Sequence, residues 1–176
     1  IEYIKKKIPN WKISLIDTGE KTETAGRLSY IKKLFKVDEN FFFTYGDGLS
    51  NINIKKLYNH HLKKNKIATI SLANPEGRFG KVVLDKNHLI KSFQEKKDGI
   101  DSYVNAGFAV FNSKIFDFIN HKSDILEKDI FPKLVKKSEL SSYIHDGFWK
   151  PMDTLRDKNL LNNLWSKRNA KWKIWS

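Results

Sequence analysis

Apolar residues along the first half of the chain form short continuous runs of the kind that suit buried strands. The runs KISLID (12–17), FFFTY (41–45) and IATISLA (67–73) are predicted strands. The middle run is apolar at nearly every position, which is typical of a strand inside a parallel sheet. We therefore expect at least three core strands before residue 75.

The segments between these runs repeat their apolar residues at helical spacing. One predicted helix covers 23–36, with Leu28, Ile31, Leu34 and Phe35 on one face. A second, capped by Ser50 or Asn51, carries Ile54, Leu57, Tyr58, His61 and Leu62. This β-α-β-α-β order predicts right-handed crossovers and a parallel core sheet.

The second half adds strands of another kind. The pattern predicts a hairpin from KVVLD and LIKSFQEK around the turn KNH, a strand over 102–111, helices near 114–120 and 124–137, a strand over 140–145 and a helix from Thr154 to about 168. Together the elements predict a three-layer, Rossmann-like α/β fold with a mostly parallel mixed sheet. In such sheets ligands bind at the carboxyl ends of the strands.

Composition narrows the class of protein. With 176 residues, 40% of them hydrophobic, the chain is large enough for one domain. Its mean hydropathy of −0.55 and lack of a long apolar run exclude a membrane span. It has no cysteine and no signal-peptide pattern, which fits a cytoplasmic protein. The net charge of +13 comes from scattered lysines, which are more typical of a solvated surface than of nucleic-acid binding.

Asp47 is the first candidate for chemistry, because it follows a predicted buried strand and lies between Gly46 and Gly48. Glycines without Cβ atoms allow an anion or a metal to approach the backbone, and a carboxylate suits Mg²⁺. The alternative is a tight turn in which Asp47 caps the next helix.

Asp153 is the second candidate. It follows Pro151 and precedes Thr154, which can itself cap the following helix, so Asp153 is not needed for capping. Two acids at strand–helix junctions suit a site for Mg²⁺ and a nucleotide. The alternative is an exposed acid favoured by the helix dipole.

Weaker signals lie elsewhere. Glu95 and Lys96 end a predicted strand and could bind a sugar hydroxyl and a phosphate, although such pairs are common on surfaces. The glycines of GRFG, including Gly80, either admit a ligand or shape a hairpin. In a lysine-rich chain, Arg27 suggests a need for the planar guanidinium group. No Ser-His-Asp arrangement is evident, which argues against acyl transfer.

Taken together, LIDTGEKTETAGRL, FFFTYGDGLSNINI, GRFG, FQEK, VNAGF, HDGFWKPMDTLRDKNLLNNLW and WKIW resemble the sugar-1-phosphate nucleotidyltransferases over nearly the whole chain. The resemblance implies Mg²⁺ between Asp47 and Asp153. It implies that Glu95 and Lys96 hold the sugar phosphate, with Gly46, Gly80 and Asn105 at the substrate and Arg27 at the nucleotide. Asp47, Lys96 and Arg27 are the implied catalytic residues.

The family opens with a Gly-rich, Arg-containing loop and a Pro-Lys-Pro segment, and neither is present here. We therefore expect residues 1–176 to be the C-terminal two-thirds of a single nucleotidyltransferase domain whose N-terminal part is absent, and this fragment alone to be inactive.

The resemblance implies that CTP and glucose 1-phosphate give CDP-glucose and pyrophosphate, in nucleotide-sugar biosynthesis for lipopolysaccharide O-antigen. A homo-oligomer is expected, with no nucleic-acid or membrane partner. The alternatives are a related transferase with another nucleotide or sugar, a basic α/β module that binds nucleic acid or an anionic partner, and an inactive relative kept for assembly. The tryptophans of the tail either pack on a neighbouring subunit or fold back on their own domain.

Overall fold

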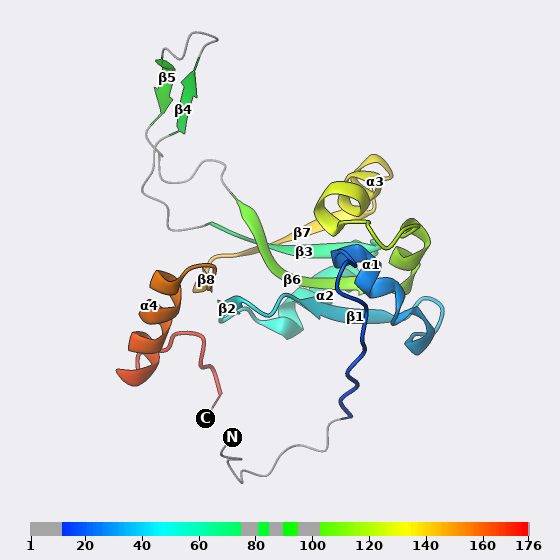
Figure 1. Cartoon of the computed structure of the whole chain (residues 1–176), viewed down its shortest axis with the longest axis horizontal. Coiled ribbons are helices and arrows are strands. Elements are labelled where there is room, and N and C mark those ends of the chain that lie inside the picture. The colour runs from blue at the N-terminus through cyan, green and yellow to red at the C-terminus, as the bar shows by residue number, and fades with distance from the viewer. Residues whose placement is uncertain (1–11, 75–80, 85–89, 95–102, 176) are drawn as a thin grey trace.

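The chain folds around a four-stranded sheet (Figure 1). The computed structural model describes residues 12–74, 81–84, 90–94 and 103–175, with the side chains of 81–84 and 90–94 left aside. The strand order is β1 (Asn40–Thr44), β6 (Val104–Asn112), β3 (Ala68–Ala73) and β7 (Leu140–His145). Strands β3 and β7 are parallel, whereas β6 runs antiparallel to both of its neighbours. Three strands thus point the same way, and the predicted mixed sheet is confirmed.

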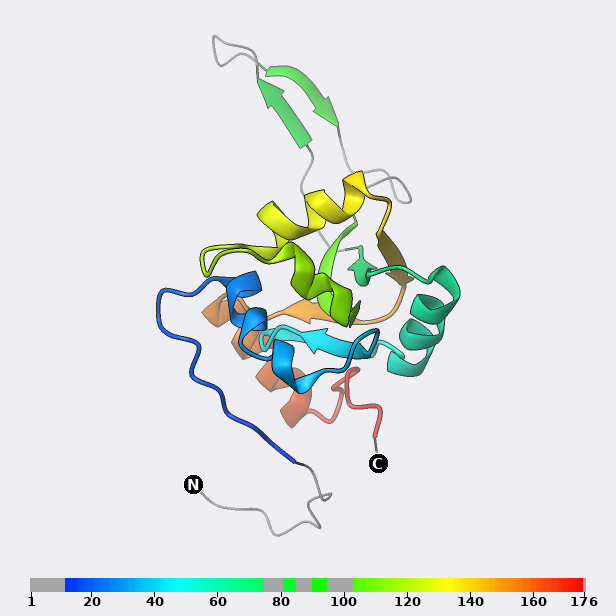
Figure 2. The ribbon, with the colours of Figure 1, turned by 90° about the vertical axis from the view of Figure 1, so that its right-hand side faces the viewer.

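Helices cover both faces of this sheet (Figure 2), as the three-layer prediction requires. Neighbouring residues of β6 point to opposite faces. Phe111 packs in one core, with residues of α1 (Thr24–Ser29), η2 (Ser113–Phe118), η3 (Leu126–Ile130) and α3 (Phe131–Lys136). Val110 packs in the other core, with Leu57 of α2 (Ile54–Lys64).

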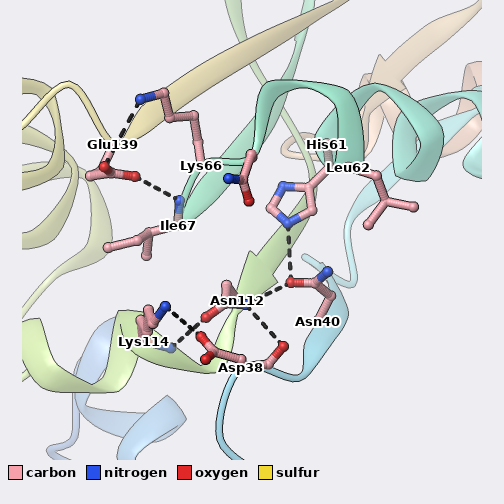
Figure 3. A pocket seen from close by; sticks show the side chains of 10 residues that line it. Asp38, Asn40, His61, Leu62, Lys66, Ile67, Asn112, Lys114 and Glu139 are labelled. Carbon is pink, nitrogen blue, oxygen red and sulfur yellow. Dashed lines mark hydrogen bonds and ion pairs between the residues drawn. The ribbon is translucent and has the colours of Figure 1, made fainter.

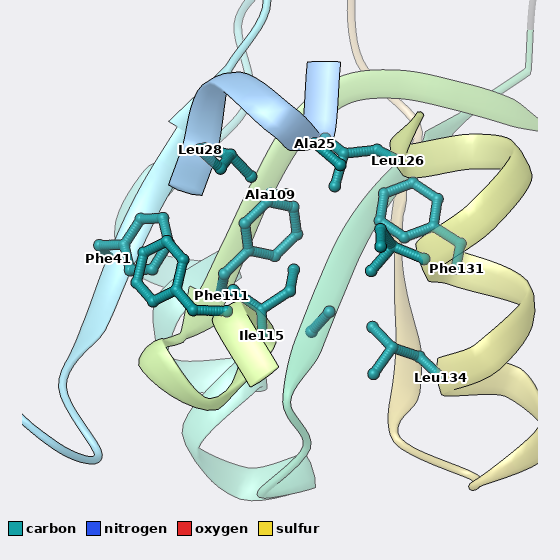
Figure 4. Packing of buried hydrophobic residues seen from close by; sticks show 12 residues of the cluster. Ala25, Leu28, Phe41, Ala109, Phe111, Ile115, Leu126, Phe131 and Leu134 are labelled. Atoms are coloured by element: carbon teal, nitrogen blue, oxygen red, sulfur yellow. The ribbon is translucent and has the colours of Figure 1, made fainter. Parts of the chain in front are cut away.

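The larger core is rich in aromatic rings (Figure 4). Phe41 from β1 stacks on Phe116 with ring centroids 5.6 Å apart and meets the edge of Phe111 at 5.8 Å. Offset-stacked and edge-to-face pairs of this kind add to the free energy gained from burying the rings. The core fixes the position of β1, and the segment that follows this strand contains Asp47.

Two pairs of strands and two helices complete the described structure. Strands β4 (Lys81–Leu84) and β5 (Ile90–Gln94) form the predicted hairpin, whose turn lies outside the described residues. Strands β2 (Gly48–Ser50) and β8 (Trp149–Pro151) form a short antiparallel ladder that was not predicted. Helix η1 (Lys32–Leu34) follows α1, and α4 (Leu155–Ser166) follows β8.

The predicted strand at 12–17 is wrong. These residues are in no strand, and Leu15 is 95% exposed. A strand needs a hydrogen-bonding neighbour, and no described strand lies beside this segment in the sheet.

The prediction that the strand at 41–45 lies inside a parallel sheet is also wrong. β1 is at the end of the described sheet and pairs only with the antiparallel β6, and its Phe42 is 52% exposed. An apolar run indicates that a strand is buried, but it does not show which strands lie beside it.

The helices differ from their predictions in their ends. α1 stops at Ser29, well before residue 36, and Leu34 of the predicted apolar face is exposed. Asn53, and not Ser50 or Asn51, caps α2 by accepting a hydrogen bond from Lys56 N. The predicted cap at Thr154 is confirmed, since its side chain accepts from Asp157 N at 3.1 Å.

The C-terminal tail folds back in part. Trp172 is buried, with its ring centroid 5.5 Å from that of Phe148 and 6.4 Å from that of Trp165, whereas Trp165 and Trp175 stay half exposed. In the described part of the chain, no helix has the length and apolar character that a bilayer crossing demands.

Candidate active site

The candidate site lies where β1, β3 and β7 end and β6 begins, which we call the carboxyl edge of the sheet. Asp47 follows β1 by three residues, Asn105 is the second residue of β6, and His145 is the last residue of β7. Segments that are distant in sequence therefore converge on one edge, as ligand sites of α/β sheets do.

The β2–β8 ladder brings Asp47 and Asp153 together. Gly48 pairs with Pro151, and Met152 N donates to the Asp47 carbonyl oxygen at 2.8 Å. Asp47 thus lies opposite Met152, one residue from Asp153, and both aspartates are exposed. A Cβ built on Gly46 would meet no atom within 4 Å, so there is open space beside the pair.

This arrangement fits a hard divalent cation. In the part of the chain that the structure describes, no cluster of three or more His, Cys, Asp or Glu side chains could hold a metal ion. Two exposed carboxylates with space for water and phosphate oxygens match the preference of Mg²⁺, whereas structural zinc sites use four protein ligands. The metal-binding roles of Asp47 and Asp153 stay a prediction.

A cluster of hydrogen bonds, the Ser50–His145 latch, holds the ladder in place. Ser50 Oγ lies 3.0 Å from His145 Nε2 and 2.9 Å from the Phe148 carbonyl oxygen, to which it donates. Trp149 Nε1 donates to the Ala106 carbonyl oxygen at 2.9 Å and so ties β8 to β6. The latch fixes the two segments that carry the aspartates.

The same contacts determine which ring nitrogen of His145 carries the proton. Its Nε2 lies 3.1 Å from the Phe148 carbonyl oxygen, which can only accept, so Nε2 carries the hydrogen. Such a nitrogen has no lone pair to take the proton of Ser50. The pair is therefore structural and does not form a nucleophilic dyad.

Two residues that sequence reasoning missed lie beside Asn105. Tyr45 OH donates to Glu127 Oε1 at 2.6 Å, and Asn105 Nδ2 lies 3.5 Å from the same oxygen. Burial and then the bond to Glu127 raise the pKa of Tyr45, so its phenol stays protonated as a donor. Glu127 comes from η3, and no spacing in the sequence links it to the other residues.

Asn105 and Arg27 are held by local contacts. Asn105 Oδ1 accepts from Gly107 N at 3.1 Å. Arg27 Nη1 donates to Thr18 Oγ1 at 2.6 Å, and Nη2 lies 3.4 Å from the Glu20 carbonyl oxygen. No described contact joins Arg27 to either aspartate, and its role at the nucleotide stays a prediction. Gly80, Glu95 and Lys96 lie outside the described residues.

A sequence model of the nucleotidyl transferase family matches residues 2–163. Since the match spans most of the chain, the protein belongs to this family. The fold described above is therefore that of a nucleotidyltransferase domain.

Two curated relatives show the range of similarity. The chain is 40% identical over 170 residues to the glucose-1-phosphate cytidylyltransferase of Salmonella typhi, covering 97% of this chain and 66% of that protein. It is 32% identical over 145 residues to a mannose-1-phosphate guanylyltransferase catalytic subunit beta of Drosophila melanogaster, covering 80% of this chain and 39% of that protein. The chain thus spans at most about two thirds of the length of these relatives.

Solved structures share the fold. HddC from Yersinia pseudotuberculosis superposes with a TM-score of 0.65 at 19% identity, over 89% of this chain and 68% of that one. A second structure of HddC, in complex with GMP-PN, superposes with a TM-score of 0.60 at 18% identity, over 83% of this chain and 64% of that one. At these identities the likeness concerns the fold alone.

Proposed function

We propose that the protein joins CTP and glucose 1-phosphate to give CDP-glucose and pyrophosphate. The observation that carries the proposal is the β2–β8 ladder, which places the exposed Asp47 and Asp153 one residue apart across two strands. The 40% identity to a glucose-1-phosphate cytidylyltransferase over 97% of the chain supports the choice of substrates.

In this reaction a phosphate oxygen of glucose 1-phosphate attacks the α-phosphorus of CTP. A new P–O bond forms, the bond from the α-phosphorus to the bridging oxygen breaks, and that oxygen leaves with pyrophosphate. The nucleophile is already an anion, so no general base is required. Catalysis then depends on alignment and on neutralising the charge at phosphorus.

The aspartate pair would hold the metal. When bound there, Mg²⁺ supplies positive charge to the phosphate oxygens. Asp47 and Asp153 flank the β2–β8 ladder and would hold the metal together, and Gly46 leaves space beside them for the triphosphate.

The remaining roles follow the resemblance. Glu95 and Lys96 would hold the sugar phosphate, with Gly80 and Asn105 nearby, and Arg27 would contact the nucleotide.

The test has two readouts. In the full-length protein, Asp47→Asn or Asp153→Asn should lower CTP-dependent pyrophosphate release by about 100-fold or more. In the 176-residue chain, either change should weaken Mn²⁺ binding measured by electron paramagnetic resonance, because one of two carboxylate ligands is lost.

Asp146→Asn is the matched control, since Asp146 is an exposed acid that directly follows β7 at the same edge. It should change neither readout. Near-normal turnover of both aspartate variants in saturating Mg²⁺ would refute the assigned roles.

A related transferase with another nucleotide or sugar is the second candidate, favoured by the 32% identity to a mannose-1-phosphate guanylyltransferase subunit. Pyrophosphate release from each pair of nucleoside triphosphate and sugar 1-phosphate separates the two. Faster turnover of GTP and mannose 1-phosphate than of CTP and glucose 1-phosphate would select this candidate.

We further propose that the protein is a cytoplasmic homo-oligomer and that it supplies CDP-glucose for lipopolysaccharide O-antigen. The half-exposed Trp165 and Trp175 support a subunit contact at the tail. Light scattering on the full-length protein tests it, and a monomer at assay concentration would contradict it.

A further inference from the structure

A hollow of about 530 Å³ lies at the opposite edge of the sheet, where β1, β3 and β7 begin and β6 ends (Figure 3). We call this the amino edge. Asn40 at the start of β1 and Asn112 at the end of β6 line the hollow. Asp47 and Asp153 belong to the other end of the sheet, so the hollow is separate from the candidate active site.

The floor of the hollow is a neutral hydrogen-bond network. Asn40 Oδ1 accepts from Asn112 Nδ2 at 2.9 Å and from His61 Nε2 at 3.3 Å. Nε2 therefore carries the hydrogen of His61, and Nδ1 accepts from Thr69 Oγ1 at 2.9 Å. His61 is 2% exposed, and burial lowers its pKa, so the ring stays uncharged. The floor is thus built before any ligand arrives.

Amide groups of this hollow stay available to a ligand. Asn40 uses its oxygen for both bonds, and among the described residues its Nδ2 donates to no acceptor. Asn65 ends α2 in the left-handed conformation, with φ +49°, and its side chain also lines the hollow. Amides both donate and accept, which suits a body that carries several hydroxyl groups.

The charges on the walls of this hollow cancel. Lys66 Nζ lies 3.9 Å from Glu139 Oε1, and Lys114 forms an ion pair with Asp38. Each of these lysines therefore has its own carboxylate. The first hollow is polar without net charge.

A second hollow of about 500 Å³ adjoins the first, because Ile67 and Lys114 line both. It is also lined by Lys133 and Lys137. Its acid, Asp117, forms an ion pair with Lys32 at 3.3 Å.

The two additional lysines have no carboxylate partner within 4 Å among the described residues. Lys133 Nζ lies 3.4 Å from the Phe118 carbonyl oxygen, and Lys137 Nζ lies 5.2 Å from the centre of the Phe118 ring. Both ammonium groups are thus held near one residue, Phe118. Two such cations in a hollow favour an anion.

We propose that the two hollows form one binding site for a small phosphorylated molecule that carries hydroxyl groups, with its phosphate at Lys133 and Lys137 and its hydroxylated body in the amide-lined hollow. Each hollow has the volume of an ordinary small-molecule site. Because the site lies at the amino edge, this inference does not rest on the proposed function.

The test is a titration of the 176-residue chain followed by amide chemical shifts in two-dimensional NMR. The probes are glucose 1-phosphate, ribose 5-phosphate and inorganic phosphate. We expect saturable shifts at the amides of Ile67 and Asn112 with both sugar phosphates. Ribose 5-phosphate is included because glucose 1-phosphate is also the proposed substrate at the carboxyl edge.

The double variant Lys133→Gln/Lys137→Gln should raise the dissociation constant of each probe at the amino edge by about 10-fold or more. The control Lys55→Gln/Lys56→Gln removes two exposed lysines of α2 that line neither hollow, and should leave it unchanged. Equal weakening by both pairs would show that net charge alone attracts the probes, and would overturn the proposal.

Asn65→Gly removes one lining amide and keeps the left-handed backbone that glycine tolerates. It should weaken both sugar phosphates several-fold and leave inorganic phosphate unchanged. Absence of saturable shifts at Ile67 and Asn112 would overturn the site even if pyrophosphate release is normal, whereas loss of that release would leave it standing.

Discussion

The two edges of the main sheet hold their polar side chains in different ways. At the amino edge, the buried His61 has both ring nitrogens hydrogen-bonded to other side chains. At the carboxyl edge, Asp47 and Asp153 are exposed, and backbone pairing of β2 with β8 brings them together. One edge is therefore built from buried contacts between side chains, and the other from a ladder that presents side chains to solvent.

Because of this difference, activity and the free energy of unfolding should respond to changes at different edges of the sheet. The exposed side chains of the two aspartates bury little surface and so contribute little to stability. The buried network loses a satisfied hydrogen bond whenever one partner is removed, which costs about 1–3 kcal/mol. We expect carboxyl-edge changes to affect activity and amino-edge changes to affect the free energy of unfolding.

We expect the greatest effect on turnover, at the carboxyl edge. If Asp47 and Asp153 hold one ion, the double variant Asp47→Asn/Asp153→Asn should lose about as much turnover as the worse single variant, because the shared ion is already lost. Pyrophosphate release by the full-length protein measures this. Losses that multiply would mean that the two acids act separately.

Gly26 and Gly46 provide the next contrast. A Cβ at Gly26 would collide with the backbone carbonyl of Lys122, whereas one at Gly46 meets nothing within 4 Å. Gly26→Ala should lower the free energy of unfolding by about 2 kcal/mol, and Gly46→Ala should change it by less than about 0.5 kcal/mol. Urea unfolding measures both. Similar values for the two variants would contradict the packing of α1 against the segment that contains Lys122.

A change in the Ser50–His145 latch should have a smaller effect, on both the free energy of unfolding and metal binding. Ser50→Ala removes hydrogen bonds to Phe148 and His145 and should cost about 1 kcal/mol of unfolding free energy. It should also weaken Mn²⁺ binding, because the ladder that carries the aspartates is less firmly held. Ser142→Ala, on an exposed position of β7, is the control and should change neither quantity.

The smallest effect concerns pH at the amino edge. Because burial lowers the folded-state pKa of His61, the unfolded chain binds a proton more readily as the pH falls below the ordinary histidine value of about 6.5. Stability from this group is full above that value and declines below it, by at most about 0.7 kcal/mol between pH 7 and pH 6.

His61→Gln should remove this part of the decline in urea unfolding at the two pH values, and the exposed His121→Gln should not. An unchanged decline in His61→Gln would show that His61 does not titrate as its burial requires.

Several elements of the fold follow from local pattern. Runs such as ATISLA and LSSYIH became β3 and β7, and the helical spacing around Leu57 became α2 with Leu57 and His61 buried. The positions of Asp47 and Asp153 beside strand ends were also readable, because an acid after a strand and an acid before a helix are features of neighbouring residues.

Other features could not be read in this way. Strand β6 lies between β1 and β3, although it follows both in sequence, and β1 is therefore paired only with an antiparallel neighbour. Residues 12–17 have the pattern of a strand but no described partner. Glu127 reaches Tyr45 and Asn105 from a helix far along the chain.

Local sequence was enough to predict several elements, among them β3, β7 and α2 with its buried face, because the spacing of apolar residues depends on the nearest turns of the chain. The tertiary structure alone decided which strands are neighbours, that β2 and β8 bring Asp47 beside Asp153, and that the amino edge encloses two hollows. Those features depend on pairings between residues up to about a hundred positions apart, whose free energies come from contacts that no local pattern encodes.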